Sequence, residues 1–195
     1  HIIVYHRPKG SKQTRRLESL GGFAPGEEPT MFPEGVGIKL PAGHELVWQL
    51  HYTPTGKEEL DCSEFAVKFC ESPPKHVARQ DAALSFNFRI PPNTSRHKVV
   101  ATRTINADSE LLAVMPHMHV RGKEFKYLAK FPDGGERTLL SVPFYDFNWQ
   151  HEYRFADPVY LPKGTVIECT AHFDNSAESP AKPEQARFES AMSPL

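Results

Sequence analysis

The chain has 195 residues, and its 23 Lys and Arg against 24 Asp and Glu give a formal net charge of −1. This length fits one large domain or two small ones, and the balanced charge argues against a nucleic-acid partner, which needs a basic surplus to neutralise phosphates. The apolar runs fall far short of the roughly 18 residues that cross a bilayer as a helix, so no membrane span is expected.

Apolar and aromatic runs bounded by Gly, Pro and Asn predict short strands along the whole chain. The 18 Pro residues favour the same interpretation, because Pro interrupts long helices. In chain order, strands are predicted at residues 1–6, 45–52, 64–70, 84–90, 97–105, 111–120, 125–131, 153–155 and 165–173. Many short strands separated by turns are typical of β-sandwiches and jelly rolls, so the predicted fold class is all-β.

The first six residues, His1-Ile-Ile-Val-Tyr-His6, form a strand-like run with no leader before it, as expected for a piece of a longer precursor. The three cysteines, Cys62, Cys70 and Cys169, are an odd number, so no disulfide framework is indicated and the redox compartment stays open. Cys62 and Cys70 would lie about 26 Å apart on one extended strand, so they could pair only across a turn.

Two segments of the chain repeat one another. The motif Leu-Pro-x-Gly occurs at residues 40–43 and 161–164, and each copy leads into a predicted strand with a His followed by an aromatic residue, at His51 and at His172. The alternative is a turn and a strand that match by chance. The repeat predicts two tandem antiparallel jelly-roll or β-sandwich domains, over residues 1–92 and 93–195.

The segment Met115-Pro-His-Met-His-Val-Arg-Gly122 places His117 and His119 two residues apart after an apolar run. Residues i and i+2 of an extended strand face the same side, about 6.6 Å apart, so the two imidazoles can converge on one metal ion. Alternate His residues on an exposed strand without a metal are the other interpretation. Thioethers that could join such a site are those of Met115, Met118 and Met192. Imidazole with thioether suits copper.

His1 and His51 lie on separate predicted strands that could be neighbours, which would form a second imidazole cluster. The alternative for His51 is a histidine satisfied inside the core. No Cys-x-x-Cys pair is present, which argues against a structural zinc site.

Motifs of other chemistries are missing from the sequence, including Gly-x-Ser-x-Gly and the glycine loops that bind phosphates or dinucleotides. The aromatic stretch Phe144-Tyr-Asp-Phe-Asn-Trp149 is expected to fill the core between two sheets rather than to stack on a ligand. Asp174-Asn175-Ser176 is expected to form an Asx-type turn after the last predicted strand.

An ordered series of motifs resembles a known enzyme family. The motifs are Phe32-Pro-Glu-Gly-Val-Gly-Ile-Lys-Leu40, Val47-Trp-Gln-Leu-His-Tyr52, Met115-Pro-His-Met-His-Val-Arg-Gly122, Tyr145-Asp-Phe-Asn-Trp149 and His172-Phe-Asp-Asn-Ser176. Together they resemble the copper type II, ascorbate-dependent monooxygenases, the family of peptidylglycine α-hydroxylating and dopamine β-monooxygenases. The resemblance is greatest to bacterial versions attached to c-type cytochrome modules, and it covers almost the whole chain.

The resemblance implies two tandem antiparallel jelly-roll domains, each holding one copper ion. For the first copper it implies His1 and His51 as ligands, with a further His that would precede residue 1. For the second copper it implies His117 and His119 together with Met192. His172 is the alternative third ligand, because the internal repeat makes it the counterpart of His51.

The resemblance also implies an activity, the hydroxylation of a C–H bond of a small-molecule or peptide substrate. The catalytic copper would bind O2 at His117 and His119, and ascorbate or another one-electron donor would reduce both coppers. Peptide hydroxylases of the family carry an Arg where this chain has Met115, so a glycine-extended peptide is not the expected substrate.

The expected location of the protein is periplasmic or secreted, with c-type cytochrome modules as partners. The alternative function is a non-catalytic β-sandwich module that binds copper or a partner within a larger redox protein. A structural or carbohydrate-binding jelly roll with incidental His residues is the third interpretation.

Overall fold

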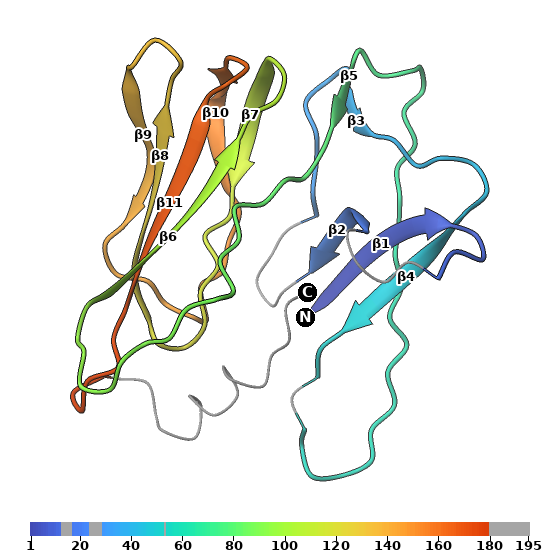
Figure 1. The fold of residues 1–195 in the computed structure, drawn as a ribbon. Helices are drawn as coiled ribbons and strands as arrows, with labels where there is room; N and C mark the ends of the chain where they lie inside the picture. Colours follow the sequence, from blue (N-terminus) through green and yellow to red (C-terminus); the bar gives the residue numbers. More distant parts are fainter. Residues whose placement is uncertain (13–16, 24–28, 53, 180–195) are drawn as a thin grey trace. The chain divides into compact units, whose positions relative to one another are not determined.

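The computed structural model describes residues 1–12, 17–23, 29–52 and 54–179 of the chain (Figure 1). These residues form eleven β-strands and no helix, which confirms the predicted all-β fold class. Because no described segment is helical, none of them offers a helix long and apolar enough to cross a membrane. The chain divides into two compact units, His1–Asp81 and Ala82–Leu195, so residues 82–92 cluster with the second unit.

The first unit contains a three-stranded antiparallel sheet in the order β2–β1–β4, and a separate pair formed by β3 and β5. Its strands are β1 (Ile2–Pro8), β2 (Glu18–Phe23), β3 (Val36–Ile38), β4 (His44–Leu50) and β5 (His76–Ala78). The predicted strands at residues 1–6 and 45–52 correspond to β1 and β4, whose register pairs Pro8 with His44. The parallel pairing of β3 with β5 differs from the antiparallel pairing that the sequence predicts.

Side chains of β1 alternate between the two faces of this sheet. Val4 and His6 lie on one face and are buried, with exposed fractions of 2% and 3%. Trp48 on β4 is the register partner of Val4, and its ring meets Phe65 edge-on at 6.2 Å. His1 belongs to the opposite face, because it is separated from Val4 and His6 by odd numbers of residues.

The second unit contains a four-stranded antiparallel sheet in the order β6–β11–β8–β9 and an antiparallel pair formed by β10 and β7 (Figure 1). Its strands are β6 (His97–Thr104), β7 (Ser109–Val114), β8 (Gly122–Lys130), β9 (Glu136–Val142), β10 (Tyr153–Leu161) and β11 (Val166–Phe173). The predicted strands at residues 97–105, 125–131 and 165–173 correspond to β6, β8 and β11.

The core of the second unit lies between its two sheets. Every second side chain of β11 is buried, as the strand period of two requires. Buried side chains from both sheets and from the segment after β7 form one cluster: Met118, Phe125, Ala129, Val159, Leu161, Ile167, Cys169, Ala171 and Phe173. A shared core between two sheets is the arrangement of a β-sandwich.

Two predicted strands are wrong. Residues 64–70 and 84–90 are apolar enough to suggest strands, but they form no ladder in the structure. Phe69 is 78% exposed and Leu84 is 61% exposed, so neither segment has the packed face that stabilises a strand. Single aromatic rings of these segments do make contacts, Phe65 with Trp48 and Phe88 with Phe173, but neither segment pairs with a strand.

Candidate metal centre

The two central histidines follow β7 rather than lying on it. The ladder of β7 ends at Val114, so the predicted strand at residues 111–120 is too long. The alternation of side chains nevertheless continues: Pro116 and Met118 are buried, whereas His117 and His119 are more exposed. The expectation that both imidazoles face the same side therefore holds without a strand ladder, and their ring centroids lie 5.2 Å apart at an interplanar angle of 83°.

Gln150 fixes the tautomer of His117. Its amide nitrogen donates a hydrogen bond of 2.7 Å to the carbonyl oxygen of Phe147, so the amide oxygen is the atom that meets Nδ1 of His117. That oxygen can only accept, so Nδ1 of His117 carries the proton and donates it. Nε2 of His117 then holds a free lone pair, the state in which an imidazole binds a metal.

Both imidazoles are biased toward the neutral form. The pKa of His117 lies below its ordinary value because protein atoms desolvate the ring, and the nearby His119 lowers it further, against the opposing effect of Gln150. The pKa of His119 is lowered by burial. His117 still exposes part of its side chain to solvent, so the ring is crowded but reachable.

The distance between the two ring centroids can be compared with the distance expected when both rings bind one metal ion. Two imidazoles that each give one nitrogen to the same metal, at about 2 Å and a tetrahedral angle, have ring centres roughly 5 Å apart. The observed 5.2 Å fits this value. An edge-to-face contact between two aromatic rings falls in the same range, so the spacing is also that of two rings in contact.

In the part of the chain that the structure describes, no third His, Cys, Asp or Glu joins the pair. Within residues 1–12, 17–23, 29–52 and 54–179, no group of three or more His, Cys, Asp or Glu side chains could hold a metal ion. Met192, the implied third ligand, lies outside the described residues.

The structure does not bring His172 to this pair. His172 lies on the face of β11 opposite to the core side chains Ala171 and Phe173. Its Nδ1 is 3.4 Å from a carboxylate oxygen of Glu124 on β8. Burial lowers the pKa of His172, and Arg96 lowers it further while Glu124 raises it.

His1 and His51 do lie together in the first unit. Their backbones exchange two hydrogen bonds, of 3.0 Å from His1 nitrogen to His51 oxygen and of 2.9 Å in the reverse direction. They therefore continue the antiparallel register of β1 and β4 by one pair. Their ring centroids are 4.1 Å apart, so the predicted cluster of these two imidazoles is present in the fold.

The repeated Leu-Pro-x-Gly motif forms the same turn in both units. Gly43 and Gly164 have φ values of 74° and 92°, a left-handed conformation that glycine adopts without strain. In each turn the residue after the glycine donates its N–H to the carbonyl of the motif's proline. The strands that follow differ: β11 is an inner strand, whereas β4 ends its described sheet, and His51 follows the end of β4 while His172 lies within β11.

The aromatic stretch from residue 144 to 149 does not fill the core as the sequence predicts. Phe144 is 90% exposed and Trp149 is 61% exposed, and only Tyr145 packs against the core cluster. The reason is a tight turn in which Asp146 accepts N–H groups from Asn148 and Trp149. The turn directs the aromatic side chains outward and carries the chain on to Gln150.

A third pair of imidazoles, His6 and His44, lies on the buried face of the sheet β2–β1–β4. The sequence did not single this pair out. Nδ1 of His6 and Nδ1 of His44 are 2.8 Å apart, within hydrogen-bond distance. Nε2 of His6 is buried without a hydrogen-bond partner, and a carboxylate oxygen of Glu18 lies 3.8 Å from it. Only the folded register of β1 and β4 brings these two residues together, so local sequence offered no signal.

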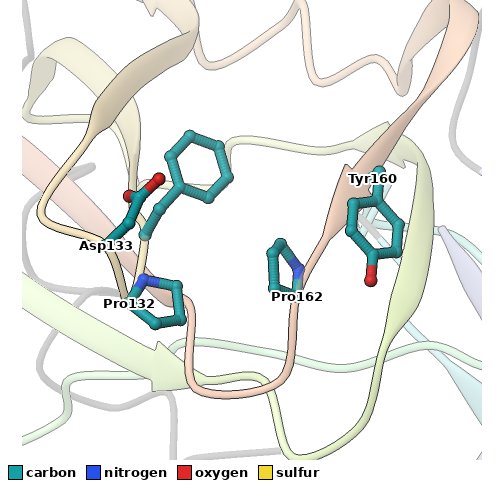
Figure 2. A pocket seen from close by; sticks show the side chains of 5 residues that line it. Pro132, Asp133, Tyr160 and Pro162 are labelled. Carbon is teal, nitrogen blue, oxygen red and sulfur yellow. The ribbon is translucent and has the colours of Figure 1, made fainter.

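A cavity of about 440 Å³ lies in the second unit at the turns that follow β8 and β10 (Figure 2). It is lined by Phe131, Pro132, Asp133, Tyr160 and Pro162. None of the candidate ligands lines it, so it is separate from the candidate metal centre.

No protein-family model matches the chain, and no curated protein matches it as a relative. The candidate centre is therefore defined by its own geometry: two imidazoles on one side of an extended segment, one of them held in a fixed tautomer. Such a pair can bind a transition metal ion such as copper.

Proposed function

We propose that His117 and His119 bind copper and that the chain is a copper-dependent monooxygenase. The observation that carries this proposal is the imidazole pair, 5.2 Å between ring centroids, with Nδ1 of His117 held by Gln150. The motif series that resembles copper type II monooxygenases supplies the reaction class.

The proposed reaction inserts one atom of O2 into a C–H bond of a small-molecule or peptide substrate. The other oxygen atom leaves as water, with two electrons from an ascorbate-like donor and two protons from solvent. Copper, when bound, supplies the one-electron redox chemistry that the reduction of O2 requires. A periplasmic or secreted location, and c-type cytochrome modules as electron-transfer partners, belong to the same proposal.

The residues of the chain have separate roles in this proposal. His117 and His119 hold the ion as neutral imidazoles, and Gln150 keeps the proton of His117 on Nδ1. Met192 is the proposed third ligand, because a thioether stabilises Cu(I). His1 and His51 are proposed to hold a second copper ion in the first unit, where their rings lie together.

The second candidate function is a non-catalytic copper-binding module of a larger redox protein. It is favoured by one observation: the described residues give the pair two imidazoles but no third His, Cys, Asp or Glu. The two candidates differ in turnover. An enzyme consumes O2 when ascorbate is supplied, whereas a module binds copper without consuming O2.

The test is ascorbate-driven O2 consumption by the full chain after loading with copper and removal of unbound metal. His117→Ala is expected to lower the rate at least about tenfold, because one of the two imidazole ligands is lost. His172→Ala and the matched control His76→Ala, an exposed residue of β5, should keep the parent rate. If His117→Ala consumes O2 as fast as the parent chain, the proposed catalytic centre is refuted. If the parent chain binds copper but consumes no O2, the chain is the copper-binding module instead.

A further inference from the structure

Tyr145 lies directly behind the segment that carries the two imidazoles. Its backbone N–H donates a 2.9 Å hydrogen bond to the carbonyl of Lys123, which ties it to β8. Its ring lies against Gly122, where a Cβ would be only 2.8 Å from the ring atom Cδ1 of Tyr145 and 2.8 Å from Cβ of Met118. The missing side chain of Gly122 is what allows the tyrosine ring to come this close.

The hydroxyl of Tyr145 makes two hydrogen bonds to one residue. It accepts from the backbone nitrogen of Met118 at 2.9 Å and donates to the carbonyl oxygen of Met118 at 2.8 Å. Met118 stands between His117 and His119 and is 3% exposed. Buried backbone groups need partners, and here one side chain serves both.

This pattern is that of a β-ladder. In an extended strand, the N–H and C=O of one residue point to the same side and bind the same residue of a neighbouring strand. The ladder of β7 has already ended at Val114, and the hydroxyl of Tyr145 takes the place of the neighbouring strand. This explains why the alternation of buried and exposed side chains continues through Met118 and His119.

We infer that Tyr145 is a positioning residue of the candidate copper centre, holding Met118 extended so that His117 and His119 face the same side. This inference rests on the proposed function. Burial raises the pKa of Tyr145 to about 12, so its hydroxyl keeps the proton that it donates at neutral pH. The hydroxyl can therefore make both bonds at once.

Tyr127 provides a matched control. Its hydroxyl donates a 2.7 Å hydrogen bond to the carbonyl of Met115, two residues before His117. Burial raises its pKa as well. Tyr127→Phe therefore removes the same atom from a similarly buried ring, but it leaves Met118 untouched.

The experiment measures the copper dissociation constant of the full chain by competition with a chelator, in a background where His1 and His51 are replaced by Ala. Tyr145→Phe is expected to weaken copper binding about 10- to 100-fold, the range seen when residues that orient metal ligands are removed. Tyr127→Phe should stay within about twofold of the parent. Tyr145→Gln keeps a group that donates and accepts, so it should bind copper more tightly than Tyr145→Phe.

A purely structural role would lower the melting temperature of both Phe variants and leave the copper affinity of the folded chain unchanged. That result, with copper binding lost only in His117→Ala, would overturn the inference while the proposed function stands. If His117→Ala binds copper as tightly as the parent chain, the proposed centre is not where copper binds, and the proposed function itself fails. If Tyr145→Phe does not fold, equal copper affinity in Tyr145→Gln and in a folded Tyr145→Leu would also contradict the inference.

Discussion

Gly122 is the first residue of β8, and a side chain at this position would collide with three groups of the candidate centre. A Cβ on Gly122 would lie 2.8 Å from Cβ of Met118, 2.8 Å from the ring of Tyr145 and 3.0 Å from the carbonyl oxygen of His119. Two of these neighbours cannot swing away, since one is a Cβ and one is backbone. Gly122 also donates its N–H to the carbonyl of His119, at 2.8 Å.

We predict that Gly122→Ala destabilises the second unit by about 1–3 kcal/mol, the usual effect of overpacking, and weakens copper binding at His117 and His119. Urea unfolding and copper competition measure the two effects. Gly135→Ala is the control, because the tightest neighbour of a Cβ there is the end of the Asp133 side chain, at 3.1 Å. An unfolding free energy for Gly122→Ala equal to that of the parent would contradict the packing described around this residue.

The sequence indicated the direction of His117 and His119 but not the residues that support them. The shared direction of His117 and His119 follows from the period of two, which survives where the ladder ends. Gln150 and Tyr145 lie about 30 residues further along the chain, and their contacts depend on the turn at Asp146. No local pattern encodes such contacts, so these supporting residues could not be predicted.

At the scale of the elements, β1 and β4 hold imidazole pairs on both faces. The ring pair of His1 and His51 continues the register at one end, and His6 and His44 meet near the other end. The pair of His6 and His44 shares one proton between two Nδ1 atoms. A second proton on Nδ1 would turn the accepting ring into a cation and leave two N–H groups facing each other.

The surroundings of His6 set the sign of the pH effect. Burial lowers its pKa below the ordinary value of 6.5, Glu18 on β2 raises it, and His44 on β4 lowers it. Below pH 6.5 the unfolded chain therefore binds a proton at His6 that the folded chain resists. The free energy of unfolding must fall as the pH falls from 6.5 toward the folded pKa of His6, and this group contributes no pH dependence above that window.

We predict that the first unit loses up to about 1.4 kcal/mol of stability per pH unit below pH 6.5 from this group. Urea unfolding followed by Trp48 fluorescence, in a Trp149→Phe background, measures it. Replacing both His6 and His44 with Leu should make the pH dependence shallower by that amount, whereas His76→Leu on the exposed strand β5 should not. The same slope in the double variant and in the parent would show that His6 does not contribute this pH dependence.

Some strands were predictable from an apolar face that meets a partner. The segments that became β1, β4, β6, β8 and β11 carry that pattern. Residues 64–70 carry comparable apolar content but form no ladder with another strand, and Phe69 is left exposed. Pairing is decided by distant segments. Apolar composition therefore predicted two strands that do not form and missed others, such as β9, which pairs with β8.

At the scale of the whole molecule, each of the two units contains one of the predicted imidazole pairs, His1 with His51 and His117 with His119. The Leu-Pro-x-Gly repeat correctly indicated the same turn in both units. It also indicated equivalent histidines, but the surroundings of the two differ, because His172 lies inside an inner strand and meets Glu124 whereas His51 follows the end of β4. A repeated turn conserves local backbone geometry, whereas the environment of a side chain depends on the sheet around it.

The central claim is that His117 and His119 bind copper. The most direct measurement is the copper content of the full chain after desalting, together with the electron paramagnetic resonance of bound Cu(II), in the background where His1 and His51 are replaced by Ala. The account predicts one copper per chain with nitrogen hyperfine structure, and loss of that copper when His117 and His119 are both replaced by Ala. Retention of the same copper, with an unchanged spectrum, would contradict it.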